Sequence, residues 1–339
     1  MAEFLQLFVN GLAVGCIYGL VALGFVLIYK AGEVVNFAQG ELVMLGAFVA
    51  FTLVVQFGLN YWVGLALAIV AMAIFGGLLD MIVVRRIIGQ PQFSTVMLTI
   101  GIGVVMRSAA AMVWGPETHS LPTPFDAATL RFGGVVLSAV YLSILATTAL
   151  LGLILFGFFR FSRIGIAMQA ASQNQLAAYC MGIPVKRVLS GVWALSAAVA
   201  TVAGVMLAPI NLIDTNLGTV GLKAFAAAVI GGFGSIPGAV LGGILIGLID
   251  LFSGVYLPQG FKDIASYIVL LIVLVVCPQG LFGSVGRPGD PDARPLSSHR
   301  DACLQCHRAR GVCTVGSAHR RVSRRCRAQA EVLRMGPRG

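Results

Sequence analysis

The chain has 339 residues, of which 58% are hydrophobic and only 11% charged, and its mean hydropathy is +0.93. Soluble proteins carry roughly a quarter charged residues, so a soluble class is excluded for most of this chain. The formal net charge of +10 is concentrated at the end, because residues 287–339 contain twelve Arg and four acids and the rest carries a net charge of +2. A basic nucleic-acid-binding surface is therefore excluded for the body of the chain.

Apolar runs recur along residues 1–285, and each is long enough to cross a bilayer, since about 20 helical residues cover ~30 Å of hydrocarbon. The first run follows Met1–Gln6, which contains one acid and no basic residue. We therefore expect a retained span and not a cleaved signal peptide. The predicted fold class is all-α, a polytopic membrane helical bundle of about eight spans. The spans are expected at Leu7–Tyr29, Glu41–Phe57, Tyr61–Val84, Phe93–Trp114, Val135–Phe159, Val188–Ile210, Leu222–Gly254 and Ile264–Leu281.

The placement of Lys and Arg predicts the orientation, because cytoplasmic loops are enriched in both. Basic residues follow the third span, separate the fifth from the sixth, and fill the tail. The segment Gly115–Gly134 has three prolines and a single Arg, so it is expected outside. Counting back places the N-terminus outside and the C-terminus in the cytoplasm. The basic loop residues are Arg85, Arg86, Arg160, Arg163, Lys186 and Arg187.

The run Leu222–Gly254 contains a glycine-rich break that a straight helix cannot accommodate. The sixth span runs from inside to outside, and the last span must enter from outside to leave the tail in the cytoplasm. The run Leu222–Gly254 must therefore start and finish on the external side, and it is too short for two full crossings. We expect a re-entrant or broken helix, which membranes tolerate where protein or a water-filled cavity covers the backbone. The alternative is a kink that serves packing alone. The candidate pathway residues at this break are Gly231, Gly234, Pro237 and Gly238.

Small residues recur four positions apart on several spans. Examples are Gly11, Gly15 and Gly19 on the first span and the pair Gly243 and Gly247 on a later one. This spacing lets helices approach closely in lipid, so it predicts a tightly packed bundle.

Ionisable residues inside spans are candidates for function because they are costly in lipid. Glu41 and Arg107 qualify, and Arg107 is expected either to pair with Glu41 or to reach the external face. For Asp80 we favour snorkelling beside Arg85. Asp250 is equally well explained as a residue that caps its helix end.

A polar cluster precedes the second span. Asn36, Gln39 and Glu41 lie in the string Asn36-Phe37-Ala38-Gln39-Gly40-Glu41, which is either an interfacial loop or a set of hydrogen-bonding groups beside a pathway. The chain contains no Gly-Lys pair, so a Walker A phosphate loop is absent, and no set of catalytic residues is evident. We therefore expect no enzyme activity and no cofactor, and any ATP must be bound by partner subunits.

The segment Ile164–Lys186 is expected to form a short helix at the cytoplasmic surface. Its Ala- and Gln-rich part favours helix, and Gly182 and Pro184 end it. Two interpretations stay open, a passive surface helix or a knob that docks into a partner.

Three strings together carry a family resemblance: Asn36–Phe48, Met168–Val188 and Lys223–Gly243. With the span count and Pro278–Gly283, they make residues 1–285 similar to the permease subunits of branched-chain amino acid ABC importers. The resemblance implies a multi-pass subunit of the bacterial inner membrane. It also implies as partners a second homologous permease subunit, two cytoplasmic ABC ATPase subunits and a periplasmic solute-binding protein.

The resemblance further implies that the segment from 169 to 182 is the helix that couples to the ATPase. The family loops usually carry an acid in this helix, whereas Ser172–Gln175 is uncharged. The coupling assignment therefore rests on position in the chain. The residues it covers are Gln169, Ala170, Ala171, Gln173, Ala177 and Gly182.

The expected function is inward transport of leucine, isoleucine and valine, energised by separate ATPases. One alternative is a permease of the same family for urea, short amides or other amino acids. A second is a stand-alone channel or ion-coupled carrier, which would work without ATPase partners.

Residues 286–339 are predicted to form a separate, Arg-rich and disordered tail after the transmembrane domain of residues 1–285. Cys303-Leu304-Gln305-Cys306-His307 matches the c-type haem attachment pattern, and Cys313, His319 and Cys326 add zinc-ligand types. Both signals are weak, and a cytoplasmic tail argues against haem, so no metal site is expected. The abundance of Arg without Lys suggests a further hypothesis, an out-of-frame read of GC-rich DNA.

Overall fold

The structure of the protein is a computed structural model. It describes residues 2–87, 92–125, 129–132, 135–173, 178, 181–258, 261–277 and 280–281. The described residues form a helical bundle with seven helices long and apolar enough to cross a membrane, which confirms the predicted polytopic helical fold. The predicted tail, with Cys303, Cys306, His307, Cys313, His319 and Cys326, lies outside the described residues.

The helices follow the predicted spans closely. The seven long ones are α1 (Ala2–Gly32), α2 (Gln39–Phe51, continued by a π-helix over Thr52–Gln56), α3 (Tyr61–Ile82), α4 (Gln92–Trp114), α5 (Ala139–Phe161), α8 (Val185–Leu207) and α10 (Ile236–Tyr256). The shorter ones are α6 (Arg163–Gln173), α9 (Val220–Gly231) and α11 (Phe261–Val276), with 3-10 turns over Val84–Ile87 and Leu217–Thr219.

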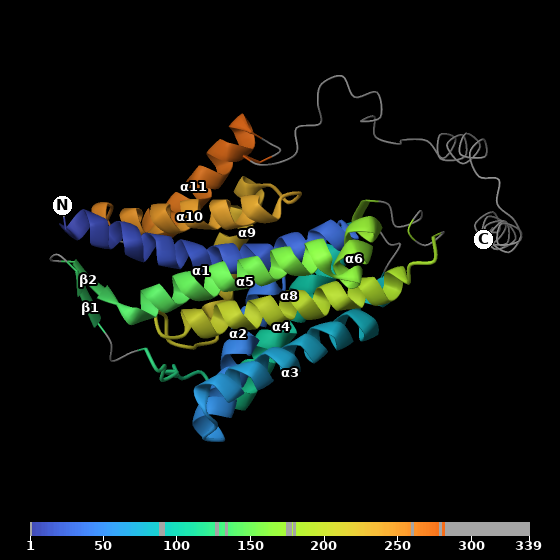
Figure 1. Ribbon diagram of the computed structural model, residues 1–339, viewed down its shortest axis with the longest axis horizontal. Helices are drawn as coiled ribbons and strands as arrows, with labels where there is room; N and C mark the ends of the chain where they lie inside the picture. Colours follow the sequence, from blue (N-terminus) through green and yellow to red (C-terminus); the bar gives the residue numbers. More distant parts are fainter. Residues whose placement is uncertain are drawn as a thin grey trace, which may run out of the picture.

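Helix α1 is the central element and is buried along most of its length. It packs against α10, α8, α9 and α5 (Figure 1). The contact with α10 is close because glycines face each other: a Cβ atom on Gly15 would lie 2.6 Å from the Cα of Ile244, and one on Gly19 would lie 3.2 Å from the Cα of Val240. The predicted role of the glycines spaced four apart is therefore confirmed for this helix pair.

Helices α3, α4 and α5 lie at the periphery, where they expose large apolar side chains. Val104 and Met112 of α4 and Leu153 and Phe156 of α5 are more than half exposed. Lipid tails accept such side chains without cost, so these faces are suited to contact with the bilayer.

A short β-hairpin precedes α5 and corrects the expected start of the fifth span. Strand β1 (Thr129–Phe132) pairs antiparallel with β2 (Val135–Ser138), with Thr129 opposite Ser138. Helix α5 begins at Ala139, where the Ser138 side chain accepts a hydrogen bond from Val140 N. The apolar stretch from Val135 was read as helix, but its β-branched residues pair with a neighbouring strand.

The predicted break in Leu222–Gly254 is present, between α9 and α10. Gly232 ends α9 with φ of 86°, a conformation that favours glycine. The two limbs differ in length, since α10 has 21 residues and can span alone whereas α9 has 12. Residues 209–216, between the end of α8 and the 3-10 turn Leu217–Thr219, are irregular, so the helical part of the first limb is short.

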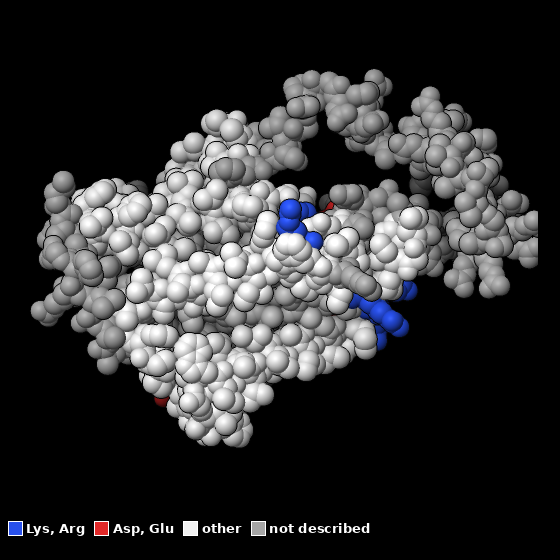
Figure 2. Space-filling view, in the orientation of Figure 1, with Lys and Arg blue, Asp and Glu red and all other residues white. Residues whose placement is uncertain are grey.

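The basic loop residues lie at one end of the bundle. Arg86, Arg160, Lys186 and Arg187 are exposed there, and Figure 2 shows the visible Lys and Arg side chains toward the end where α6 lies, with the rest of this face nearly uncharged. At the opposite end, His119 and Ile213 form an isolated antiparallel bridge. This distribution is the one that membrane proteins show across a bilayer.

Candidate functional site

Helix α2 begins in the middle of the bundle. Its first residue, Gln39, has Oε1 3.0 Å from the hydroxyl of Ser196, the central residue of α8. A Cβ atom on Gly103, the central residue of α4, would lie 3.3 Å from Cγ of Glu41. The chain between α1 and α2 therefore crosses the first part of the bundle without helix.

Helix α9 begins at the same place. A Cβ atom on Gly221 would lie 2.6 Å from the Cα of Gly40, and one on Gly218 would lie 2.7 Å from Oε1 of Glu41. The N-terminal ends of two helices thus meet beside one carboxylate, and each end carries partial positive charge. Discontinuous helices that start at this depth are how transporters place charged groups beside a pathway.

The segment before α2 is fixed by hydrogen bonds to its own residues and to α4. Oδ1 of Asn36 accepts from the backbone N of Ala38 at 3.1 Å, and Oγ1 of Thr99 accepts from the backbone N of Phe37 at 3.3 Å. Asn36 and Gln39 are completely buried. In this conformation both predicted pathway residues hold the turn in place and line no surface.

Arg107 of α4 pairs with Glu41, one of the two positions expected for it. Its Nη2 donates to Oε1 of Glu41 at 2.5 Å. The Arg107 side chain is 42% exposed and that of Glu41 10%. Oε2 of Glu41 and Nε of Arg107 are buried without a hydrogen-bond partner among the described residues.

A second ion pair lies inside the bundle and was not foreseen. Nζ of Lys223 in α9 is 2.7 Å from Oδ1 of Asp250 in α10, and the Tyr18 hydroxyl of α1 donates to Oδ2 at 2.9 Å. Asp250 is therefore not a helix cap, because it is buried six residues before α10 ends at Tyr256. The signal that could have found Lys223 is a single cation in the apolar run Val220–Gly231.

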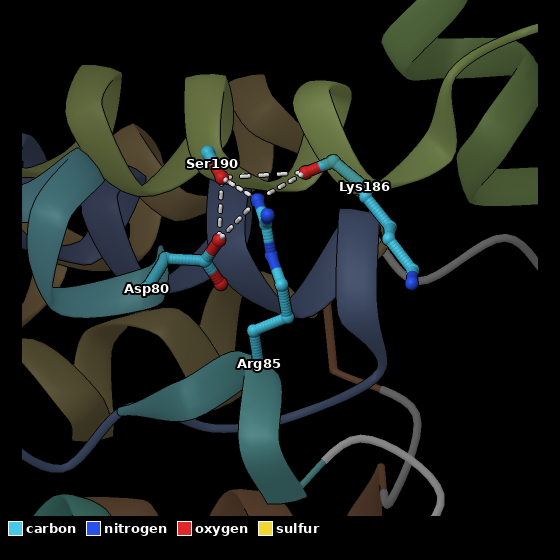
Figure 3. A network of polar contacts seen from close by, with 4 residues as sticks. All are labelled: Asp80, Arg85, Lys186 and Ser190. Atoms are coloured by element: carbon cyan, nitrogen blue, oxygen red, sulfur yellow. Dashed lines mark hydrogen bonds and ion pairs between the residues drawn. The ribbon is translucent and has the colours of Figure 1, made fainter. Parts of the chain in front are cut away.

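Asp80 also differs from its expected role. It does not snorkel, because its side chain is completely buried. Oδ2 accepts from the Ser190 hydroxyl at 2.6 Å and lies 3.6 Å from Nη2 of Arg85, which also donates to the Lys186 carbonyl oxygen at 3.1 Å (Figure 3). This network fastens the end of α3 to the first turns of α8.

The predicted coupling segment begins as helix α6, six residues earlier than position 169. Within it, Gln169 is exposed and Ala171 is buried. Gly182 has φ of 88° in the turn before α8. Ala170 and Gln173 also lie in α6, whereas Ala177 lies outside the described residues.

The glycine-rich break between α9 and α10 lies near one end of the bundle and not halfway through it. The Phe233 ring is 4.6 Å from that of Tyr29, near the end of α1. Ile236 lines a small pocket there together with Lys30 and Met168. The break therefore lies near α6 and away from Glu41, and it brings together the predicted residues Gly231, Gly234, Pro237 and Gly238. The helix interruptions at the depth of Glu41 are different ones, which precede α2 and α9.

The fold and the charged junction define a polytopic membrane protein with discontinuous helices, the architecture of a solute permease. The chain belongs to the family "Branched-chain amino acid transport system / permease component", whose model matches residues 7–276.

The chain is similar in sequence to known relatives over most of their length. The chain is 32% identical to the high-affinity branched-chain amino acid transport system permease protein LivH of Escherichia coli strain K12, over 83% of this chain and 96% of the relative. It is 31% identical to BraD of Pseudomonas aeruginosa over the same shares. A probable LivH of Methanocaldococcus jannaschii is 28% identical over 78% and 88%. PsaBC from Streptococcus pneumoniae in complex with Fab is a distant structural neighbour, with 16% identity and a TM-score of 0.45 over 80% and 91%.

Proposed function

We propose that this chain is one of two membrane-spanning subunits of an ABC importer that carries branched-chain amino acids into the cytoplasm. Its partners would be a second, homologous permease subunit, two cytoplasmic ABC ATPases and a periplasmic solute-binding protein, in a bacterial inner membrane. Membership of the permease family and the names of the relatives support the substrate class. The observation that carries the assignment is the family match over residues 7–276, and the meeting of α2 and α9 at Glu41 supports a pathway through the bundle.

The pathway would run past this junction. Glu41 and Arg107 are its charged lining, and the buried residues Asn36 and Gln39 hold the end of α2 at the correct depth. The break with Gly231, Gly234, Pro237 and Gly238 would form the inner exit, where α9 and α10 hinge.

The ATPases would bind at α6 and the turn that follows it. Ile164 and Ile166 of α6 are more than half exposed and Met181 is 84% exposed, at the end of the bundle that carries the basic residues. A Cβ atom on Gly165 would lie 2.8 Å from the Cα of Phe159, so α6 and the end of α5 pack closely. A push on α6 would therefore reach the bundle directly.

The orientation follows from the same residues. The end with Arg85, Arg86, Arg160, Lys186 and Arg187 would face the cytoplasm. Helix α1 would then start outside, and the tail after α11 would lie inside.

Reconstitution tests this function. The chain, its partner permease and both ATPases are placed in proteoliposomes, and uptake of radiolabelled L-leucine is measured with the binding protein outside and ATP inside. We expect uptake that requires ATP and every subunit. Uptake by the permeases alone would establish the ion-coupled carrier instead, and competition by urea or acetamide in preference to leucine would establish the amide permease.

The coupling assignment is tested in the same vesicles. Replacing residues 169–175 by Gly and Ser should abolish uptake while the permease still inserts. Replacing Leu150 and Leu153, which are exposed on α5, by other apolar residues is the control, which should leave uptake unchanged. Unchanged uptake by the 169–175 variant would contradict the assignment.

A further inference from the structure

The Glu41–Arg107 pair differs from the other ion pairs in the described part of the chain by its exposure. The Arg107 side chain is 42% exposed, against 14% for Lys223 and 28% for Arg85 at the end of α3. Arg107 lies four residues beyond the centre of α4, about 6 Å along the helix axis. A guanidinium exposed to hydrocarbon at this depth is costly. The exposed part of the Arg107 guanidinium therefore needs water or protein beside it, although Val104 on the neighbouring part of α4 is suited to lipid.

The pair also leaves hydrogen-bonding groups unused. A carboxylate accepts at two oxygens and a guanidinium donates from three nitrogens, yet the contact joins Nη2 to Oε1 alone. Oε2 of Glu41 and Nε of Arg107 are buried and unpartnered within the described residues. Buried polar atoms are normally satisfied, so these two indicate an arrangement that is completed by another group.

The surroundings of Glu41 are rigid and closely packed. Gly40, Gly218 and Gly221 bring the starts of α2 and α9 into backbone contact beside it. The carboxylate is thereby held at one fixed position, whereas Arg107 is on a peripheral helix and has a flexible side chain. A fixed Glu41 carboxylate and a movable Arg107 guanidinium suit a site that opens for a ligand bearing both a positive and a negative charge.

We infer that Glu41 and Arg107 bind the main chain of the transported amino acid, with Glu41 accepting from the α-ammonium group and Arg107 donating to the α-carboxylate. The inference rests on the proposed function as an amino acid permease. The ligand replaces the Glu41–Arg107 contact, and its side chain remains outside the charged pair. Recognition at this point is therefore the same for leucine, isoleucine and valine. A neutral amide has neither charge and gains nothing from the pair.

Uptake by the complete reconstituted transporter tests this inference. Glu41→Gln and Arg107→Gln should each lower uptake at least about tenfold, by the same factor for L-leucine, L-isoleucine and L-valine, since a charge-assisted hydrogen bond is among the stronger polar contacts. Arg107→Lys keeps the charge and should retain more uptake than Arg107→Gln. Glu117→Gln and Arg86→Gln change exposed residues of the same types and should transport normally.

A double variant separates recognition from mere support of the fold. If the pair only holds α4 on α2, Glu41→Gln with Arg107→Gln removes both charges and should restore uptake toward normal, because no uncompensated charge remains. If the pair binds substrate, the double variant should be at least as impaired as either single one. Restoration, normal uptake by the single variants, or factors that differ among the three amino acids would each overturn the inference. Absence of uptake by the unmodified complex would instead overturn the proposed function.

Discussion

Ser196 of α8 meets Gln39 of α2 halfway through the bundle. The Ser196 hydroxyl lies 3.0 Å from Oε1 of Gln39 and 3.0 Å from the carbonyl oxygen of Gly24 in α1. One side chain therefore joins three helices at the depth where α2 begins. It also links α8, which starts beside the coupling segment, to the helix that carries Glu41.

Ser196→Ala should lower the stability of the purified complex by about 1 kcal/mol, the typical net value of one hydrogen bond. It should also slow uptake, because the start of α2 loses its link to α8. Thermal unfolding and leucine uptake are the measurements. The control is Ser143→Ala, since within the described part of the chain that hydroxyl bonds only to Val140 O of its own helix. Equal effects of the two changes would contradict a special role for Ser196.

Gly40→Ala should destabilise the fold by roughly 1–3 kcal/mol, the usual cost of overpacking. The new methyl group would lie 3.0 Å from the Cα of Gly221 and would collide with the carbonyl oxygen of Gly218. The yield of folded protein on size-exclusion chromatography is the readout. Gly101→Ala serves as the control, because no atom of the described residues lies within 4 Å of its added Cβ atom. That change should be neutral or slightly stabilising, as alanine favours helix.

Lys223→Met should destabilise the protein by about 3–5 kcal/mol, because it leaves the buried Asp250 carboxylate without its counter-ion. Among the described residues, the Tyr18 hydroxyl would then be the remaining donor to Asp250. Adding Asp250→Leu should restore most of the loss, since both charges are gone. Thermal unfolding of the single and double variants measures this, and a double variant no better than the single one would refute the pairing.

Arg85→Ala should reduce the number of leucine molecules transported per ATP hydrolysed. Arg85 connects Asp80 of α3 to Ser190 and the Lys186 carbonyl oxygen of α8 (Figure 3). Without it the first turns of α8 are freer to move, so a push at α6 is transmitted less completely. The control is Arg86→Ala, because Arg86 is the exposed neighbour of Arg85. This change should leave the number of leucine molecules transported per ATP unchanged. Parallel assays of uptake and phosphate release decide between the two outcomes.

Several residues show where prediction from sequence reached its limit. Glu41 and Arg107 could be selected because each is a charge in an apolar run, but they are 66 residues apart and their pairing had an alternative. Lys223 was missed although it obeys the same rule, and its partner Asp250 was assigned to a helix end. Strand β2 of the hairpin before α5 falls within a span predicted as helix, because an apolar run of β-branched residues fits both structures.

By itself the sequence determined that this is a multi-pass helical membrane protein, where most spans lie, that one of them is broken, and which family it resembles. These properties follow from hydropathy, glycine and proline in short windows, which act locally along the chain. Only the tertiary structure decided that α2 and α9 start side by side at Glu41, that Asp80 is buried, and that Tyr18 reaches Asp250 across 232 residues. Such contacts depend on which helices pack together and at what depth, and no local pattern specifies that.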